Sequence, residues 1–496
     1  LYGVENSGIR SIHSLLKQNG FKTHLIFFKR WLNNDVEFIT EKEKIIFIDL
    51  LKDLNIEIVG FSFTSPFLMF AKNLTEIVKK ELGIIVVWGG IHATVRPEDS
   101  LNYCDFVLRG EGELAMLDFA KAVFGSQSLK GTRNLCYKNN KEVVIEKMRP
   151  LIQNLEMLPH QYYGPDDKFF LDGSLKRIEP LKNARELRVF ASRGCPFNCS
   201  YCYNNILKDL YKEDRFHRIK DVEYVISEIE QGLSNLKKIR KIKFDDDTFV
   251  FPEDWIAEFS RSYRKRIGLP FEVLFNSSCL NKDSLKKLKI AGLKHIQVGI
   301  QTASEQKAEE LYARSNYNSR IAELAWVAED LNLNVVYDLI FDNPLIGFKD
   351  NERLINFLLE LPRPFSLFMY SLTVFPGTQL SRILLNKGLI SESDIEGEAT
   401  KSFYQFRLNF SYLRLPEETF AIAIASLTSK SFIPKPAIRY LSTSSFLKRR
   451  PLFVRWLAQL SNFIKLFYIG IKMFMQGALN WWKLKEYGLP KRFLIQ

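Results

Sequence analysis

Three of the six cysteines lie in one short segment, FASRGCPFNCSYCYN, directly after a predicted strand. Cys195, Cys199 and Cys202 have the spacing Cys-x3-Cys-x2-Cys. Thiolates on so short a loop can converge on one face of an iron–sulfur cube, because soft sulfur ligands suit iron. Three ligands leave one iron with an open position, where chemistry can take place. A tetrahedral zinc site is the alternative, but it needs a fourth ligand, and the nearest candidate, His217, lies outside the usual finger spacing.

The cysteine loop follows the first of six segments that have the pattern of buried strands. These predicted strands are ELRVFASRG, IRKIKFDDDTF, FEVLFNSS, HIQVGIQT, NVVYDLIF and FSLFMYSLTVF. Helical patterns separate them at 221–235, 253–266, 281–291, 305–313, 318–331 and 350–361. Repeated βα units with one kind of connection predict a partial (β/α)6 barrel over residues 183–395. Ligand sites in such barrels lie at the carboxyl ends of the strands, which is where the cysteine loop stands.

Polar residues follow the next three strands at the same edge. They are Asp246 and Asp247 after the second strand, Asn276 and Ser278 after the third, and Gln301 after the fourth. An anionic carboxylate can receive a cationic ligand group, although successive aspartates can also cap the next helix. Because the carboxyl ends of parallel strands meet at one edge, we expect these side chains to surround one site.

Residues 1–125 have the pattern of another α/β unit. Val/Ile-rich runs such as IEIVGFSF and IIVVWGG alternate with amphipathic helices, which predicts a doubly wound, Rossmann-like domain around a parallel sheet. Residues 126–182 are a predicted connector, with a hairpin around Asn139–Asn140 and prolines after it. Residues 396–496 lack the strand rhythm and are predicted to be mainly helical. A hydrophobic fraction of 46% excludes a disordered chain.

The cysteine motif, with aromatic Tyr201 before its last cysteine, resembles that of the radical S-adenosylmethionine (SAM) enzymes. GIQTASE is similar to the family's Gly-Ile-Gln-Ser-Gly-Ser-Glu run, with Thr302 and Ala303 in place of Ser and Gly. The resemblance implies a [4Fe–4S] cluster on the three cysteines, SAM on the fourth iron, and reductive cleavage of SAM to a 5′-deoxyadenosyl radical. The SAM contacts that it implies are Tyr201, Asp246, Asp247, Asn276, Ser278 and Gln301. It indicates no catalytic acid or base.

Loops at the strand ends of the first domain resemble those of the cobalamin-binding domain that precedes many radical SAM domains. The residues implied to surround the corrin are Ser62, Gly89, Gly90, His92, Gly110, Glu111 and Glu113. The motif Asp-x-His-x-x-Gly, which ligates cobalt through histidine, is absent, so bound cobalamin should lack that ligand. The alternative is a doubly wound domain that binds nothing.

The strand that usually opens a cobalamin-binding domain is missing before the first predicted helix. A sheet without an internal strand exposes unpaired backbone groups. We therefore expect truncation at the N-terminus rather than a degraded domain.

The resemblance predicts a cobalamin-dependent radical SAM enzyme. The expected reaction is methyl transfer to an unactivated carbon or phosphorus centre, or else radical cyclisation or rearrangement. The expected partners are a small-molecule or lipid-like substrate and an electron donor such as flavodoxin or ferredoxin. A radical SAM enzyme without functional cobalamin is one alternative. An RNA-modifying methylthiotransferase is disfavoured, because it needs three more cysteines upstream and only Cys104 and Cys136 lie there.

The net charge of +13 comes almost entirely from the C-terminal region. From Lys430 onward there are thirteen basic residues and one acid, Glu486, so the catalytic part is nearly neutral and nucleic acid is not an expected partner. From Arg455 to Lys483 a polar stripe stands opposite aromatic residues. This pattern predicts a helix that either packs on the barrel or lies on an anionic membrane.

Composition and chain pattern also bear on the compartment. Few cysteines and no signal peptide favour the cytoplasm, with a peripheral position at the inner membrane surface as a further possibility. The C-terminal apolar stretch is interrupted by Lys465 and Lys472 and is too short to span a bilayer. A non-enzymatic scaffold on the membrane would leave the cysteine trio unexplained.

Overall fold

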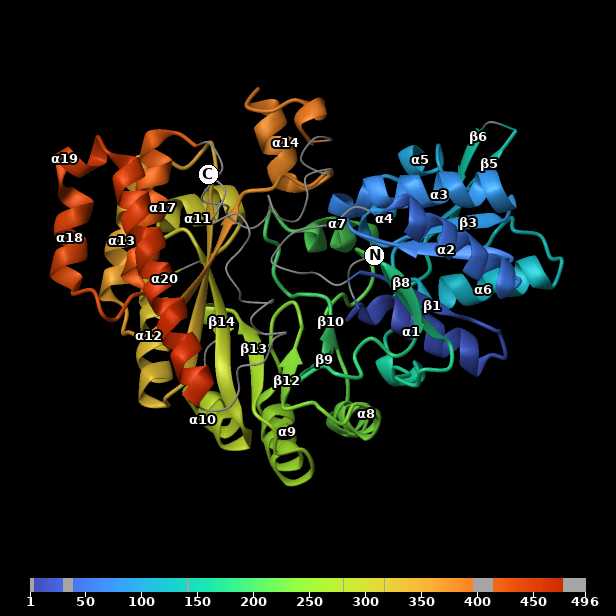
Figure 1. The fold of residues 1–496 in the computed structure, drawn as a ribbon, viewed down its shortest axis with the longest axis horizontal. Helices are drawn as coiled ribbons and strands as arrows, with labels where there is room; N and C mark the ends of the chain where they lie inside the picture. The colour runs from blue at the N-terminus through green and yellow to red at the C-terminus, as the bar shows by residue number, and fades with distance from the viewer. Residues whose placement is uncertain are drawn as a thin grey trace.

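The protein forms two βα bodies that lie side by side, and a helical layer covers the far end of the second (Figure 1). The computed structural model describes residues 4–29, 39–140, 142–279, 281–315, 317–395 and 414–475. In Figure 1 the first body is drawn blue to cyan, the second green to orange, and the last helices red.

The first body contains a five-stranded sheet with three parallel strands on one side and an antiparallel hairpin on the other. Its strands, in spatial order, are β2 (Ile58–Ser62), β3 (Ile85–Gly89), β4 (Phe106–Leu108), β5 (Leu135–Asn139) and β6 (Glu142–Ile145). The predicted hairpin is present, since β5 and β6 pair antiparallel at one edge. The main helices are α1 (Ser7–Gln18), α2 (Glu41–Asp53), α3 (Leu68–Leu82) and α6 (Glu113–Phe124). Helix α3 packs with Val86 and Trp88, and α6 packs with Val87 on the opposite face of β3.

The sheets of the first body are interrupted between β1 and β2. Strand β1 (Leu25–Phe28) pairs in parallel with β7 (Lys168–Asp172), which in turn pairs with β8 (Ser174–Arg177). Residues of both β1 and β2 line a cavity between them. Strands β5 to β8 belong to the predicted connector, which therefore contributes to the sheets of the first body.

The second body is the predicted partial barrel. Its six parallel strands are β9 (Glu186–Val189), β12 (Lys241–Phe244), β13 (Phe271–Phe275), β14 (Leu293–Gln301), β15 (Asn334–Phe341) and β16 (Ser366–Ser371). The helices between them are α8 (Val222–Asn235), α9 (Glu253–Arg266), α10 (Lys282–Ala291), α11 (Glu305–Tyr312), α12 (Asn318–Asp330) and α13 (Phe348–Glu360). Strands β9 and β16 are the two edges, so the barrel is open between them. The predicted fold class is confirmed.

Shorter elements lie at the carboxyl edge of the barrel. They are β10 (Ser192–Arg193), β11 (Arg218–Ile219), α7 (Tyr203–Leu210) and α14 (Gln379–Asn386). Strands β10 and β11 pair antiparallel, and the chain between them carries the three cysteines and α7. The cysteine loop is therefore tied to the barrel at both of its ends.

The described part of the C-terminal region, residues 414–475, is helical, as predicted. Its helices are α17 (Pro416–Thr428), α18 (Lys435–Thr443), α19 (Ser445–Lys448) and α20 (Pro451–Met475). Helix α17 is buried and contacts both α13 and α20. Among the described residues, no helix has the length and apolar character needed to cross a membrane. The predicted polar stripe continues to Lys483, which lies outside the described residues.

One buried hydrogen bond offers a test of the packing behind the end of β3. The Trp88 indole N–H donates to the Thr75 hydroxyl at 2.8 Å, and both side chains are buried. We expect Thr75→Val to lower the free energy of unfolding by about 1–3 kcal/mol, because the indole N–H loses its acceptor. Urea unfolding followed by tryptophan fluorescence measures the change. Thr428→Val is the control, since the Thr428 hydroxyl donates only to Ala425 of its own helix; equal losses in both variants would contradict the prediction.

Candidate active site

Asp246 holds the strand that precedes the cysteine loop. Its carboxylate accepts hydrogen bonds from the Ser192 N–H and hydroxyl, each at 2.5 Å, and from the Ala191 N–H at 3.3 Å. Burial raises the pKa of Asp246 to about 7, although the hydrogen bonds from Ser192 oppose this shift. The carboxylate therefore ties the end of β12 to the start of β10.

A glycine turns the chain from β10 into the cysteine loop. Gly194 has φ +78°, and a Cβ at this position would overlap the main-chain oxygen of Phe216. Both the backbone conformation and the close approach require glycine here. The direction in which Cys195 leaves the strand is set by this turn.

Main-chain hydrogen bonds brace the cysteine loop against two other segments. The Ser200 N–H donates to the Tyr312 carbonyl at 3.1 Å, and the Leu380 N–H donates to the Ser200 carbonyl at 2.9 Å. Helix α7 begins directly after the loop, with its last cysteine as the N-cap residue. All three cysteines are partly buried and form no disulfide: Cys195, Cys199 and Cys202.

The three thiols are of the kind that an iron–sulfur cluster needs. Within the described residues, no three His, Cys, Asp or Glu side chains are gathered so as to hold one ion. Thiolates of a four-iron cube each bind a different iron, so they need not converge on one point. Burial raises the pKa of Cys195 to about 11 and that of Cys202 to about 12. Both are protonated without metal, and loading iron must release these protons.

Arg314 is a residue of the site that the sequence did not indicate. Its guanidinium lies 3.9 Å from the Cys199 sulfur, donates to the Tyr201 hydroxyl at 3.3 Å and donates to the Gly299 carbonyl at 3.2 Å. It follows α11 by two residues, and an arginine in such a loop has no local signal. Arg314 therefore places a positive charge beside one cluster ligand. It also holds Tyr201, a predicted SAM contact.

The two predicted aspartates face different surroundings. Asp247 lines the large cavity at the strand ends and is hydrogen-bonded to Asn204 of α7. Burial raises the pKa of Asp247, while the bond from Asn204 lowers it. The Asp246 carboxylate instead accepts hydrogen bonds from Ser192, in the strand before the cysteines. Of the pair, Asp247 is the carboxylate that a ligand in the cavity can reach.

The other predicted SAM contacts make local hydrogen bonds at the strand ends. The Asn276 carboxamide oxygen accepts from the Ser278 N–H at 3.0 Å and from its hydroxyl at 2.8 Å. Gln301 has φ +59° and folds back over Gly299, with its amide nitrogen 3.3 Å from the Gly299 carbonyl oxygen. A Cβ on Gly299 would lie 2.5 Å from the end of this side chain, so a larger residue there would displace the Gln301 amide. The SAM contacts of these residues stay predictions.

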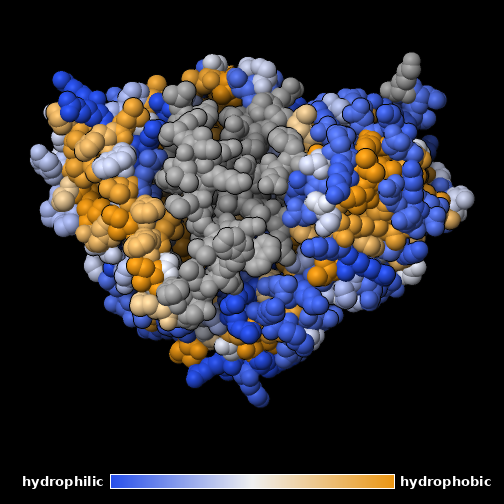
Figure 2. Space-filling view, viewed as in Figure 1, coloured by the Kyte–Doolittle hydropathy of each residue, from blue (hydrophilic) through white to orange (hydrophobic). Residues whose placement is uncertain are grey.

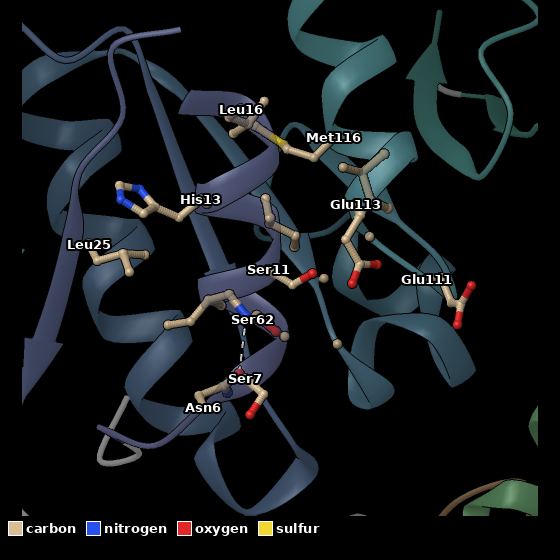
Figure 3. A pocket seen from close by; sticks show the side chains of 18 of the residues that line it. Asn6, Ser7, Ser11, His13, Leu16, Leu25, Ser62, Glu111, Glu113 and Met116 are labelled. Atoms are coloured by element: carbon tan, nitrogen blue, oxygen red, sulfur yellow. Dashed lines mark hydrogen bonds between the residues drawn. The ribbon is translucent and has the colours of Figure 1, made fainter. Parts of the chain in front are cut away.

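A cavity of about 1470 Å³ lies where the strand ends of the first body meet the cysteine loop. The first body contributes Ser62, Gly89 and Gly90, and α1 contributes small polar residues such as Ser11 (Figure 3). The second body contributes residues on both sides of the cysteines: Gly194, Tyr203, Asn204, Leu207 and Asp247. The cavity exceeds the range of about 300–1,000 Å³ that is common for small-ligand pockets. It also reaches the interruption between β1 and β2.

Glycine at position 90 keeps two strand ends together at this cavity. Gly90 has φ +86°, and a Cβ there would lie 2.6 Å from the Phe63 carbonyl oxygen. The backbone at Gly90 therefore lies directly against the backbone of Phe63, the residue after β2. Ser62 and Gly89 remain on the cavity wall. These residues fit the predicted corrin site, because they leave its wall free of bulky side chains.

His92 does not face the cavity. It is buried, its Nδ1 lies 3.0 Å from the Ser65 hydroxyl, and its ring stacks on Phe63. Burial lowers the pKa of His92 to about 4, so the imidazole is neutral. The sequence placed it beside the corrin, but the structure directs it into the packing of the first body.

Gly110, Glu111 and Glu113 line the cavity, but their nearest partners are residues of the second body. A Cβ at Gly110 would overlap the Tyr211 hydroxyl, so the close approach there is to a tyrosine. Both carboxylates are paired with arginines that flank the cysteine loop, at distances of 2.5 to 3.4 Å. Figure 3 shows Glu113 beside Ser11 of α1. Contacts of these residues with cobalamin stay predictions.

Two protein families match the two bodies. Residues 2–120 match the B12 binding domain, and residues 189–359 match the radical SAM superfamily. The chain is a radical SAM enzyme with a B12-binding domain. Its cofactors are cobalamin, SAM and the [4Fe–4S] cluster. The three thiols fit the cluster, and Ser62, Gly89 and Gly90 fit the corrin site.

This radical SAM enzyme has methyltransferases and a cyclase among its relatives. An uncharacterized methyltransferase of Pyrococcus horikoshii is 28% identical over 69% of this chain and 72% of its own length. The anaerobic magnesium-protoporphyrin IX monomethyl ester cyclase of Cereibacter sphaeroides is 25% identical, and the match covers 52% of this chain but 42% of the cyclase. The radical SAM methyltransferase TsrM of Kitasatospora setae, solved with cobalamin and a [4Fe–4S] cluster, has a TM-score of 0.62 at 14% identity. That match covers 92% of this chain and 97% of TsrM. The fold of the whole two-body unit is shared.

Removing the charge beside Cys199 should change the redox potential of the bound cluster. We expect Arg314→Gln to lower its midpoint potential by on the order of 100 mV, because a nearby positive charge favours the reduced state. Redox titration followed by electron paramagnetic resonance measures the shift. Arg320→Gln is the control, since Arg320 pairs with Glu323 on the outer surface of α12. A potential equal to that of the wild type in Arg314→Gln would contradict the assigned role.

Proposed function

We propose that this enzyme uses cobalamin and SAM to transfer a methyl group to an unactivated carbon or phosphorus centre of a small or lipid-like substrate. One observation carries the proposal. The strand ends of the B12-binding domain and the residues that flank the cluster cysteines line the same cavity. A substrate in this cavity can therefore contact both cofactor sites, as a transfer between them requires.

The residues of the chain bind and orient the reacting groups. When bound, the reduced cluster supplies the electron that cleaves SAM, and cobalamin supplies a carrier for the methyl group. The three thiols hold the cluster, Arg314 lies against Cys199, and Asp247 offers a carboxylate to a cationic group in the cavity. Tyr203 and Leu207 of α7 form an apolar part of the cavity wall, which helps to exclude water from the site.

Radical cyclisation or rearrangement is the second candidate reaction. The match to the magnesium-protoporphyrin IX monomethyl ester cyclase supports it, because that relative is named for a ring closure. We favour methyl transfer because the match to the Pyrococcus horikoshii methyltransferase covers more of this chain, and more of the relative, than the match to the cyclase does. Either reaction needs an external one-electron donor, and we propose a small redox protein such as flavodoxin or ferredoxin.

Cofactor loading tests the cluster site. Anaerobically reconstituted protein is expected to bind about four irons per chain, and Cys199→Ala is expected to lose them together with all SAM cleavage. Cys279→Ala is the control and should keep the iron, since Cys279 lies after β13, outside the cysteine loop. Formation of 5′-deoxyadenosine by a variant lacking all three loop cysteines would overturn the assignment.

The products of SAM distinguish the two candidate reactions. S-adenosylhomocysteine alongside 5′-deoxyadenosine selects methyl transfer, whereas 5′-deoxyadenosine alone selects cyclisation or rearrangement. Retention of corrinoid after gel filtration checks the B12-binding domain. Protein that cleaves SAM but holds no corrinoid would be an ordinary radical SAM enzyme.

We also propose that α18, α19 and α20 rest on an anionic membrane surface. Figure 2 shows hydrophobic residues gathered over the C-terminal helices at the left of the molecule. Helix α20 packs inward through Val454 and Ala458, while Trp456 is 54% and Phe467 is 62% exposed. The partly buried side of α20 carries the polar stripe, so its aromatic face is the one left outward. A large exposed apolar surface of this kind is typical of an interaction site.

The positive charge of this surface favours an anionic lipid membrane over a neutral partner. The sequence from Lys430 to Met475 contains no Asp or Glu. Arg439, Arg449 and Arg450 are exposed near α18 and α19, and the Arg450 guanidinium lies 4.0 Å from the ring of Phe446. Basic and aromatic residues together are the pattern of an interfacial helix.

Liposome flotation tests the membrane proposal. We expect binding to vesicles that contain phosphatidylglycerol and a loss of at least tenfold in Trp456→Ser/Phe467→Ser. Vesicles of phosphatidylcholine alone should bind weakly, because the basic residues then lack a partner. Ile290→Ser is the control, as Ile290 is 61% exposed on α10. No binding to anionic vesicles would refute the proposal.

A further inference from the structure

We propose that Glu111 and Glu113 form, with Arg193 and Arg218, an interdomain clamp that positions the cluster loop against the B12-binding domain. The clamp joins the loop after β4 to β10 and β11 of the radical SAM domain. The inference rests on the proposed function, in that both cofactors act in one cavity. It assigns these four residues to positioning rather than to contact with the corrin.

The first half of the clamp holds the chain just before the cluster ligands. Arg193 donates to Glu113 at 2.5 Å and to Glu111 at 3.4 Å. Burial disfavours the charge of Glu113, but Arg193 outweighs it and the pKa of this carboxyl stays below its usual value. Arg193 is followed by Gly194 and then by Cys195. If the Arg193–Glu113 ion pair changes position, Cys195, the first cluster ligand, must move with it.

The second half holds the chain just after the cluster ligands. Tyr211 is the C-cap residue of α7, whose N-cap is Cys202. Its hydroxyl accepts a hydrogen bond from the Glu111 N–H at 3.1 Å and lies where a side chain on Gly110 would be. The same short loop of the first domain thus contacts both ends of the cluster-binding segment.

Arg218 closes the arrangement from the strand that pairs with β10. It donates to the two carboxylate oxygens of Glu111 at 2.8 and 3.0 Å, and to the Ile152 carbonyl at 2.9 Å. Its side chain is 4% exposed. A buried, doubly hydrogen-bonded pair fixes both distance and orientation.

The acceptor oxygens of the clamp are already occupied by protein donors. Glu111 accepts from Arg193, Arg218 and the Ile152 N–H, and Glu113 accepts from Arg193 and Ser11. Two carboxylates and two guanidinium groups balance in charge. A corrin amide that bound here would have to displace an ion pair, which is why we assign these residues to positioning.

A clamp of this kind couples the two cofactor sites. Ordering the cysteine loop by iron also orders the loop at Glu111, which lines the cavity. Coupling between two sites is reciprocal, so cluster loading should tighten corrinoid binding and corrinoid should stabilise the loaded loop. We expect an effect of about tenfold, within the usual range for coupled sites.

The first test needs no cofactor. Hydrogen exchange of the Ser200 and Cys202 amides, measured by mass spectrometry on the full chain, should become at least tenfold faster in Glu113→Gln. Peptides from β13 to β15 should not change. Glu43→Gln is the control, because Glu43 is a buried carboxylate paired with Lys29 inside the first domain. Unchanged exchange of the cysteine loop in Glu113→Gln would overturn the proposal.

The second test separates positioning from direct contact. Hydroxocobalamin is titrated into cluster-free and cluster-loaded protein, and its Kd is compared between the two forms. In the wild type the loaded form should bind about tenfold more tightly, and in Glu113→Gln this difference should vanish. A residue that touches the corrin would instead weaken both forms by one factor and leave the difference intact, which would overturn the clamp.

Variants at Arg193 keep the proposal testable if one of them folds poorly. Arg193→Lys retains the charge but loses the forked geometry, so it should keep part of the tenfold difference, whereas Arg193→Gln should abolish it. Adding Glu113→Gln to Arg193→Gln should cost nothing further, since both remove one interaction. Wild-type protein that binds no hydroxocobalamin would count against the proposed function, while the hydrogen-exchange result would still decide on the clamp.

Discussion

The placement of the cluster cysteines depends on how the two residues of β10 are held. Ser192 is bonded to a buried carboxylate at the end of β12, and Arg193 is paired with a carboxylate of the neighbouring domain. Neither interaction is local in sequence, and each uses a charged group away from bulk water. A carboxylate that loses its donor in such a place is costly, so the arrangement tolerates little change. Because β10 is held in place, the turn at Gly194 also fixes the direction in which the chain continues to Cys195.

Parallel βα architecture explains why two cofactor sites can share one cavity. Both bodies present the carboxyl ends of their strands at an edge, where backbone groups and short loops are free to receive a ligand. The first body brings small residues such as Gly89 to this edge, and the second brings thiols and polar side chains. Residues of both edges line one cavity, so the two cofactor sites open onto the same space.

Positively charged side chains lie both beside the cluster cysteines and in the C-terminal region. Near the cysteines, Arg314 stands beside Cys199 and Lys208 hydrogen-bonds the Phe197 carbonyl, so positive charge accompanies the thiols of an anionic cluster. The excess of basic residues belongs to the C-terminal region of the sequence, from Lys430 onward. Part of this charge is packed inside the protein, because Lys430 is buried, and burial lowers its pKa to about 8. The exposed remainder accompanies aromatic side chains, and it bears on docking rather than on the chemistry.

The sequence by itself determined the cysteine motif, the six barrel strands and the alternation of the first domain, because apolar periodicity and ligand spacing are local properties. It also located the polar ends of the second, third and fourth barrel strands. Tertiary structure alone decided which of these side chains face the cavity, since neighbours at a strand end point in different directions: Asp247 lines it while Asp246 and His92 are turned into the packing. The partners of Glu111 and Glu113, and the position of Arg314, depend on segments about 80 to 115 residues away. No local pattern encodes such contacts, because they form only once distant segments have folded together, within the second body for Arg314 and between the two bodies for Glu111 and Glu113.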